Sequence, residues 1–127
     1  MRNLEINKKS YIALNYLGVE EVEDELGNKT GEKVVKYSKP IPFRTHLSGA
    51  SGSVYLDSNG ASIEYDKTMV LTLWEFEKLK FTENTVFFID TKPKYDNDKR
   101  PLYDYRVARI RDSLNEVVIL LKKVRNN

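Results

Sequence analysis

The single histidine, His46, and the serines after it are the residues best suited to nucleophilic catalysis in this chain. A hydrolytic triad needs a serine activated by an imidazole, and a carboxylate that orients the ring. Ser48, Ser51 and Ser53 follow His46 closely, but no G-x-S-x-G elbow presents any of them. The sequence therefore predicts a surface or strand histidine and a chain that is not an enzyme.

Two other stretches have part of a ligand-binding pattern. The run from Ser48 to Gly52 has the small residues of a phosphate loop but lacks its Lys-Ser/Thr pair. The run from Asp96 to Asp98 is similar to the start of a calcium loop, but the later glycine and glutamate are missing. The chain has no cysteine and one histidine, which disfavours a zinc site. The sequence predicts no metal and no cofactor.

Charge is distributed unevenly along the chain, although the net charge is only +2. Residues 18–32 carry six carboxylates and one lysine, whereas residues 92–127 carry ten Lys or Arg and five carboxylates. Net charges of −5 and +5 are typical of copies that contact head-to-tail or of a basic surface for nucleic acid; two solvated surfaces that simply differ are the alternative. The residues expected at a subunit interface or facing DNA are Arg106, Arg109, Arg111, Lys122, Lys123, Glu21, Glu23 and Glu25.

Tyr103 and Tyr105 precede these arginines and open a second hypothesis. Small barrels that bind nucleic acid track the phosphates with cations and stack bases on aromatic rings. The alternative is that both tyrosines lie at the edge of the core while the arginines pair with the acidic region. We favour the alternative, because the chain has no RNP-like motif and a nearly balanced charge.

Short alternating stretches predict the strands that position these groups. Gly27-Asn28 and Thr30-Gly31 have turn chemistry, so the first third is predicted to be one hairpin. A helical turn at 20–25 is the alternative there. The expected strands cover residues 11–16, 33–37, 43–47, 68–73, 85–89 and 105–111.

Two segments allow two structures each. Residues 74–81 suit either two short strands or one helical turn between strands. Residues 113–125 have a capping box, Ser113 to Glu116, and helical spacing, but Val117 to Leu121 is as apolar as a buried strand. We favour a hairpin with residues 105–111, because the rest of the chain predicts short strands.

The stretch at 48–60 is mostly Ser, Gly, Ala and Asp, which predicts a long mobile loop between strands. Residues 1–10 are polar and predict a flexible arm. The residues expected to form a gating or docking loop are Ser48, Gly49, Ser51, Gly52 and Gly60.

Length and composition predict a single domain, residues 1–127, with an all-β fold. The expected architecture is a small β-barrel or sandwich with long loops and room for one short helix. The longest apolar run, Val117 to Leu121, is far shorter than a membrane span, and the N-terminus lacks a signal-type apolar region, so we expect no membrane partner. The predicted core comprises Leu14, Val35, Phe43, Leu47, Val70, Phe87, Ile89, Val107 and Ile119.

Two central motifs, YSKPIPFRTHLSGASG at 37–52 and GASIEYDKTMV at 60–70, carry a family resemblance. Further motifs that carry the resemblance are YIAL at 11–14, DELGNKTGE at 24–32, and YDY at 103–105 followed by SLN at 113–115. Together they resemble the head-closure, or head–tail connector (minor capsid), proteins of siphovirus-type tailed phages. The resemblance covers nearly the whole chain, and residues 71–90 match it least well.

The resemblance implies a structural virion protein of the head–tail connector. Copies of such a protein form a homo-oligomeric ring below the portal or adaptor, help retain packaged double-stranded DNA and provide the tail attachment surface. Subunits often form rings only on their partner, so an isolated chain can be a monomer. The implied location is the head–tail interface of the virion, and the host cytoplasm during assembly. The alternative is a small nucleic-acid-binding barrel.

Overall fold

The computed structural model describes residues 9–49, 52–55, 62–97, 99–112 and 114–125. Of the predicted flexible arm, Lys9 and Ser10 begin the first strand, and residues 1–8 lie outside the described residues. The elements are β1 (Lys9–Leu14), β2 (Tyr16–Glu23), β3 (Lys29–Tyr37), β4 (Ile41–Thr45), β5 (Leu47–Ser48), β6 (Gly52–Tyr55), β7 (Ser62–Tyr65), β8 (Lys67–Thr72), α1 (Leu73–Leu79), β9 (Val86–Phe88), β10 (Tyr105–Asp112) and β11 (Glu116–Lys123).

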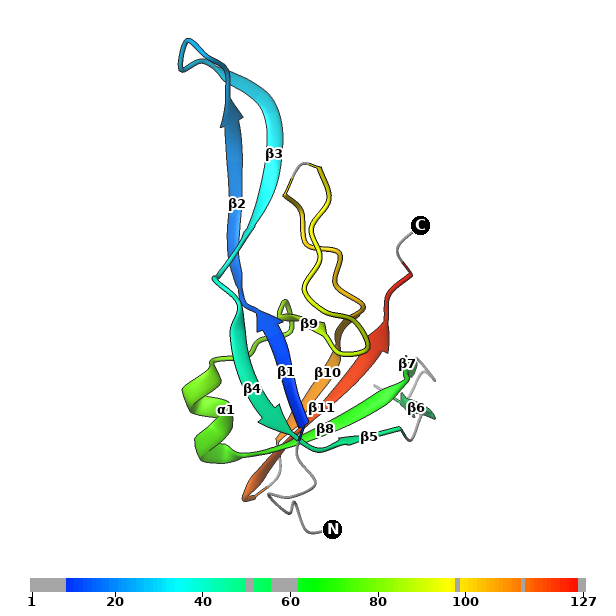
Figure 1. Cartoon of the computed structure of the whole chain (residues 1–127). Coiled ribbons are helices and arrows are strands. Elements are labelled where there is room, and N and C mark those ends of the chain that lie inside the picture. Colours follow the sequence, from blue (N-terminus) through cyan, green and yellow to red (C-terminus); the bar gives the residue numbers. More distant parts are fainter. Residues whose placement is uncertain (1–8, 50–51, 56–61, 98, 113, 126–127) are drawn as a thin grey trace.

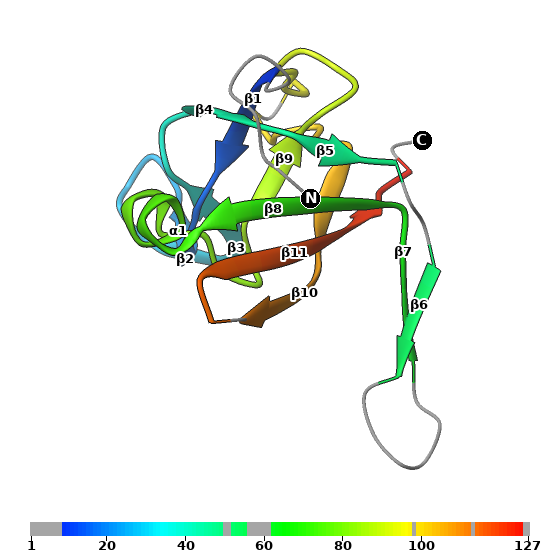
Figure 2. The same cartoon turned by 90° about the horizontal axis from the view of Figure 1, so that it is seen from below.

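The main sheet has seven strands in the order β4-β1-β9-β10-β11-β8-β5. Its two end strands, β4 and β5, are separated in the chain by His46 alone, so one bent segment pairs with β1 at one end and β8 at the other. The sheet therefore curls into a nearly closed barrel, which is clearest when viewed from below (Figures 1 and 2). The predicted all-β barrel with one short helix is confirmed.

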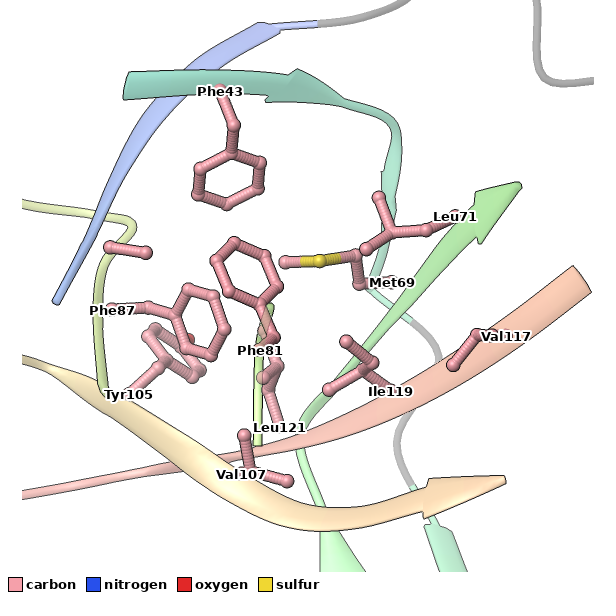
Figure 3. Close-up of a cluster of buried hydrophobic side chains, with 11 residues drawn as sticks. Phe43, Met69, Leu71, Phe81, Phe87, Tyr105, Val107, Val117, Ile119 and Leu121 are labelled. Carbon is pink, nitrogen blue, oxygen red and sulfur yellow. The ribbon is translucent and has the colours of Figure 1, made fainter. Parts of the chain in front are cut away.

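Aromatic rings fill the barrel interior. Phe81 and Phe87 pack edge-to-face at 5.2 Å, and Phe43 lies 5.2 Å from Phe81 and 5.9 Å from Phe87 (Figure 3). Edge-to-face pairs of this kind add stability beyond the area that they bury. Aliphatic side chains from β8, β10 and β11 complete the cluster, namely Met69, Leu71, Val107, Val117, Ile119 and Leu121.

A second, smaller core lies on the outer face of β1 and β9. It consists of Leu14, Val86 and Phe88, which are covered in part by Tyr37 and Tyr103. Because Tyr37 ends β3 and Tyr103 precedes β10, this core joins the base of the first hairpin to the barrel.

Both ambiguous segments are resolved. Residues 73–79 form α1, which begins at Thr72 with a capping box: Thr72 Oγ1 accepts from Glu75 N at 3.1 Å, and Glu75 Oε1 accepts from Thr72 N at 3.0 Å. Of the two structures expected for residues 74–81, the helical one is therefore present, and Phe76 and Leu79 pack onto the barrel interior. The C-terminal segment is strand β11, so the favoured hairpin with β10 is confirmed.

The structure differs from the sequence prediction in three places. Residues 11–14, expected in the first hairpin, belong to β1 and pair with β4 and β9 in the barrel. Residues 52–55 form β6 and pair with β7, so residues 48–60 are not one continuous loop; residues 50, 51 and 56–60 lie outside the described residues. Val35 was expected in the core but is 44% exposed. The reason is that β3 pairs only with β2 and projects away from the barrel (Figure 1).

Candidate functional site

Three of the predicted basic residues share one face because of a β-bulge. Val107 pairs with Leu121 and Arg109 with Leu120, which leaves Ala108 without a partner residue. Arg106, Arg109 and Arg111 therefore lie together on the outer face of β10, although strict alternation would put Arg106 and Arg109 on opposite faces. Val107 and Ile110 point inward to the core.

Lys122 joins these arginines, whereas Lys123 does not. Lys122 is the register partner of Arg106 on the outer face, and its Nζ lies 3.4 Å from Glu64 Oε2. Lys123 is the register partner of Tyr105, whose side chain is buried in the barrel, so it belongs to the other side of the strand. We call Arg106, Arg109, Arg111 and Lys122 the basic face.

Neither predicted stacking tyrosine lies on the basic face. Tyr105 is buried in the barrel interior, and its hydroxyl donates to Asp90 Oδ2 at 3.0 Å. Burial, together with Asp90, raises the pKa of Tyr105. Tyr103 packs in the second core, with its ring 6.4 Å from that of Tyr37. Tyr103 therefore lies at the edge of a core, as expected, whereas Tyr105 lies within the main core rather than at its edge.

The acidic candidates lie on the hairpin of β2 and β3, which extends away from the barrel (Figure 1). Including β3 adds two lysines, so residues 16–37 carry six carboxylates and three lysines, a net charge of −3. Lys29 Nζ lies 3.8 Å from Glu21 Oε2, and Lys36 Nζ lies 3.0 Å from Glu20 Oε2. The hairpin's own lysines thus neutralise part of its negative charge. The remaining negative charge is concentrated at the tip, in Glu23, Asp24 and Glu25.

The same hairpin exposes more large apolar side chains than any other element of the described chain. They are Tyr16, Leu17, Val19, Leu26 and Val35. A two-stranded ribbon is at best marginally stable in water without a packing partner.

Asn15 links this hairpin to the barrel and fixes its direction. Its Nδ2 donates to the Leu79 carbonyl at 3.1 Å, and its Oδ1 accepts from Thr85 Oγ1 at 2.8 Å. Its backbone N–H donates to Ser38 Oγ at 3.0 Å, and its carbonyl accepts from Ser38 N at 2.8 Å. These hydrogen bonds hold the start of β2 and the end of β3 next to the barrel.

The predicted loop residues do not gather into one site. Ser48 belongs to β5, opposite Thr68, and Gly52 belongs to β6, opposite Tyr65. Gly49 is exposed between these strands, while Ser51 and Gly60 lie outside the described residues. Ser48 and Gly52 were expected in a loop but are paired in strands, and the gating or docking role of the five residues stays a prediction.

A groove between β4 and α1 was missed by the sequence reasoning. Its volume is about 510 Å³, and Pro42, Phe43, Arg44, Trp74, Lys78 and Leu79 are among the residues that line it. Trp74 is 67% exposed, and Lys78 Nζ lies 5.0 Å from the centre of its ring. The sequence signal that could have indicated this groove is Trp74, the single tryptophan, in a segment where apolar and polar residues do not alternate regularly.

No metal-binding arrangement is found in the described part of the chain. No group of three or more His, Cys, Asp or Glu residues there is placed to hold a metal ion. His46 is half-buried between β4 and β5. None of the helices described in the structure is both long and apolar enough to cross a membrane.

Comparisons of the chain with protein-family models, curated proteins and solved structures find no match.

Proposed function

We propose that this chain is a structural assembly protein whose copies form a ring, with the β2–β3 hairpin as the main assembly element. The setting implied by the sequence resemblance is the head–tail connector of a tailed phage, below the portal or adaptor, where the ring helps retain DNA and receives the tail. Its partners there are further copies of the chain, the portal or adaptor, and tail proteins.

The observation that carries this proposal is the unpartnered hairpin. It projects from a nearly closed barrel, exposes Leu17, Val19 and Leu26, and packs on the barrel only at its base. Beyond that base, the ribbon leaves these apolar side chains exposed, and a binding partner would bury them. The hairpin and the barrel are different surfaces, so a contact between them is heterologous, and repeated heterologous contacts generate a ring when the rotation closes.

The test is to replace residues 19–35 by a short Asn-Gly turn joining Gly18 to Lys36, which are Cα partners in the hairpin. The shortened chain should keep the barrel and lose ring formation. Native mass spectrometry of the intact chain mixed with the portal and tail proteins of the same phage should give a ring of fixed copy number. A folded, shortened chain that still assembles normally would contradict the proposal.

A nucleic-acid-binding barrel is the second candidate, and the bulge at Ala108 is the observation that favours it. The bulge gathers three arginines and Lys122 on the outer face of β10 and β11, where Arg106 and Arg111 are exposed and Arg109 and Lys122 are half-buried. Arg and Lys side chains on one face can bind phosphates without reading sequence. Glu64, which pairs with Lys122, reduces the positive charge at one side of this face. Contact with packaged DNA would use the same residues.

A further inference from the structure

The tip of the hairpin is a preformed apolar knob surrounded by acidic side chains. Asp24 Oδ1 accepts from the backbone N–H groups of Leu26 and Asn28, both at 2.9 Å, and Asp24 N donates to the Asn28 carbonyl at 2.8 Å. Gly27 provides the positive φ, +82°, that the turn requires. The turn therefore holds Leu26 outward, 86% exposed.

The groove between β4 and α1 has the complementary chemistry. Its walls are apolar at Phe43, Trp74 and Leu79, and Arg44 and Lys78 bring two cationic groups to it. Glu75 also lines the groove; its carboxylate accepts from Thr72 N and keeps its negative charge, so Arg44, Lys78 and Glu75 together leave the groove with a net charge of +1. A volume of about 510 Å³ falls within the range of about 300–1,000 Å³ that is usual for binding pockets.

The knob cannot reach this groove within one molecule. The hairpin tip lies at one end of the chain's long dimension, and α1 lies near the other end (Figure 1). Only a second copy can bring the two surfaces together.

We infer that Leu26 of one copy docks into the β4–α1 groove of the next, with Glu23 and Glu25 facing Arg44 and Lys78. This inference rests on the proposed function and names the contact that builds the ring. Trp74 and Leu26 supply the apolar contact, because buried tryptophans are common interface hot spots. The charges set orientation and encounter rate. The hydrogen bonds of the turn favour the conformation in which Leu26 points outward, and this lowers the entropy lost on docking.

One knob in one groove is smaller than the standard interface of about 1,600 Å². A single contact is therefore weak, and many copies held on a partner gain from effective concentration. This explains how a chain can be monomeric when isolated and still form a ring on a portal.

Trp74 is the only tryptophan of the chain, so its fluorescence reports docking directly. Emission should shift to shorter wavelength as protein concentration rises, because the exposed ring becomes buried. Leu26→Asp should weaken this association by about 30-fold or more, as expected for a hot spot. Leu114→Asp is the matched control, since Leu114 is 92% exposed at a different hairpin tip. Equal effects of the two variants would overturn the inference.

Disulfide trapping gives a second, independent measurement, because the chain has no cysteine of its own. Mixing a Leu26→Cys chain with a Pro42→Cys chain should give a mixed dimer much faster than Leu114→Cys with Pro42→Cys. A yield no higher than this control at any concentration overturns the inference. Faster trapping of Leu26→Cys with Arg109→Cys also overturns it, in favour of the basic face as the receiving surface.

The two proposals fail in distinguishable ways. A ring of fixed copy number on the portal, without trapping above the control, overturns the groove contact and leaves the assembly function standing. A chain that stays monomeric with its portal and tail partners overturns the assembly function itself.

Discussion

At the residue scale, the barrel depends on three rings that meet in its interior. Phe87 is fully buried and packs against Phe43 and Phe81. Phe87→Ala should lower the free energy of unfolding by about 3–5 kcal/mol, through lost burial and the cavity that remains. This is a large share of the roughly 5–15 kcal/mol typical of a domain, so urea unfolding will detect it. Wild-type stability in this variant would contradict the assigned core.

Tyr37 provides a pH-dependent prediction. Burial, with Tyr103 and Tyr16 beside it, raises the pKa of Tyr37 from 10.0 to about 12. Between these values the unfolded chain loses the proton while the folded chain keeps it, so the free energy of unfolding falls as pH rises. The contribution is fully present below pH 10 and is lost as pH rises through about 12. Tyr37→Phe should lose less stability than the wild type between pH 9 and pH 11 in urea unfolding. An equal loss in both proteins would count against the raised pKa.

At the element scale, the chain combines a well-packed barrel with a hairpin that packs only at its base. Asn15 makes this combination possible. It lies between β1 and β2, and its backbone and side chain form hydrogen bonds with Ser38, Leu79 and Thr85 there. The two elements should therefore differ in local stability, since exposed hydrogen bonds with few apolar contacts open more easily.

Hydrogen exchange measures this difference. In the isolated chain, amides of residues 19–35 should exchange much faster than those of β9, β10 and β11, because the hairpin has two unpaired edges. In a reconstituted ring the hairpin amides should become protected. Hairpin protection equal to the barrel's in a monomer would argue against an assembly role.

At the scale of the whole molecule, two charged surfaces have to be assigned to different partners. The sequence predicts that Glu21, Glu23 and Glu25 meet Arg106, Arg109 and Arg111 of a neighbouring copy. The structure puts the most acidic part of the hairpin beside the exposed Leu26, and this favours a receiving surface that is apolar as well as cationic. The basic face is then left available for phosphates.

Replacing Arg106, Arg109 and Arg111 by Gln separates these assignments. If the basic face contacts DNA, the triple variant should bind more weakly, and the slope of log affinity against log salt should become shallower by about one unit per lost phosphate contact. Circular dichroism should show an intact barrel, since Arg106 and Arg111 are exposed and Arg109 is half-buried. Loss of ring assembly with unchanged DNA binding would instead support the predicted contact between arginines and acidic hairpin.

The sequence by itself determined the class of fold and most of its strands. Alternation at Phe43 to Leu47 and the apolar runs at 86–88 and 117–121 are local signals, because each records which faces of a strand are buried. The C-terminal hairpin and the turn of the first hairpin also followed from turn residues and composition, but residues 11–14, expected in that first hairpin, belong to the barrel.

The tertiary structure alone decided which residues share a surface. Val35 has the pattern of a core strand, but its strand has no sheet to pack against, so it is exposed. One unpaired residue, Ala108, aligns three arginines whose spacing in the sequence does not predict a common face. Trp74 and Arg44 lie 30 positions apart and form one groove only because the chain returns from β8 into α1 beside β4. Such surfaces depend on register and on long-range packing, which no local pattern records.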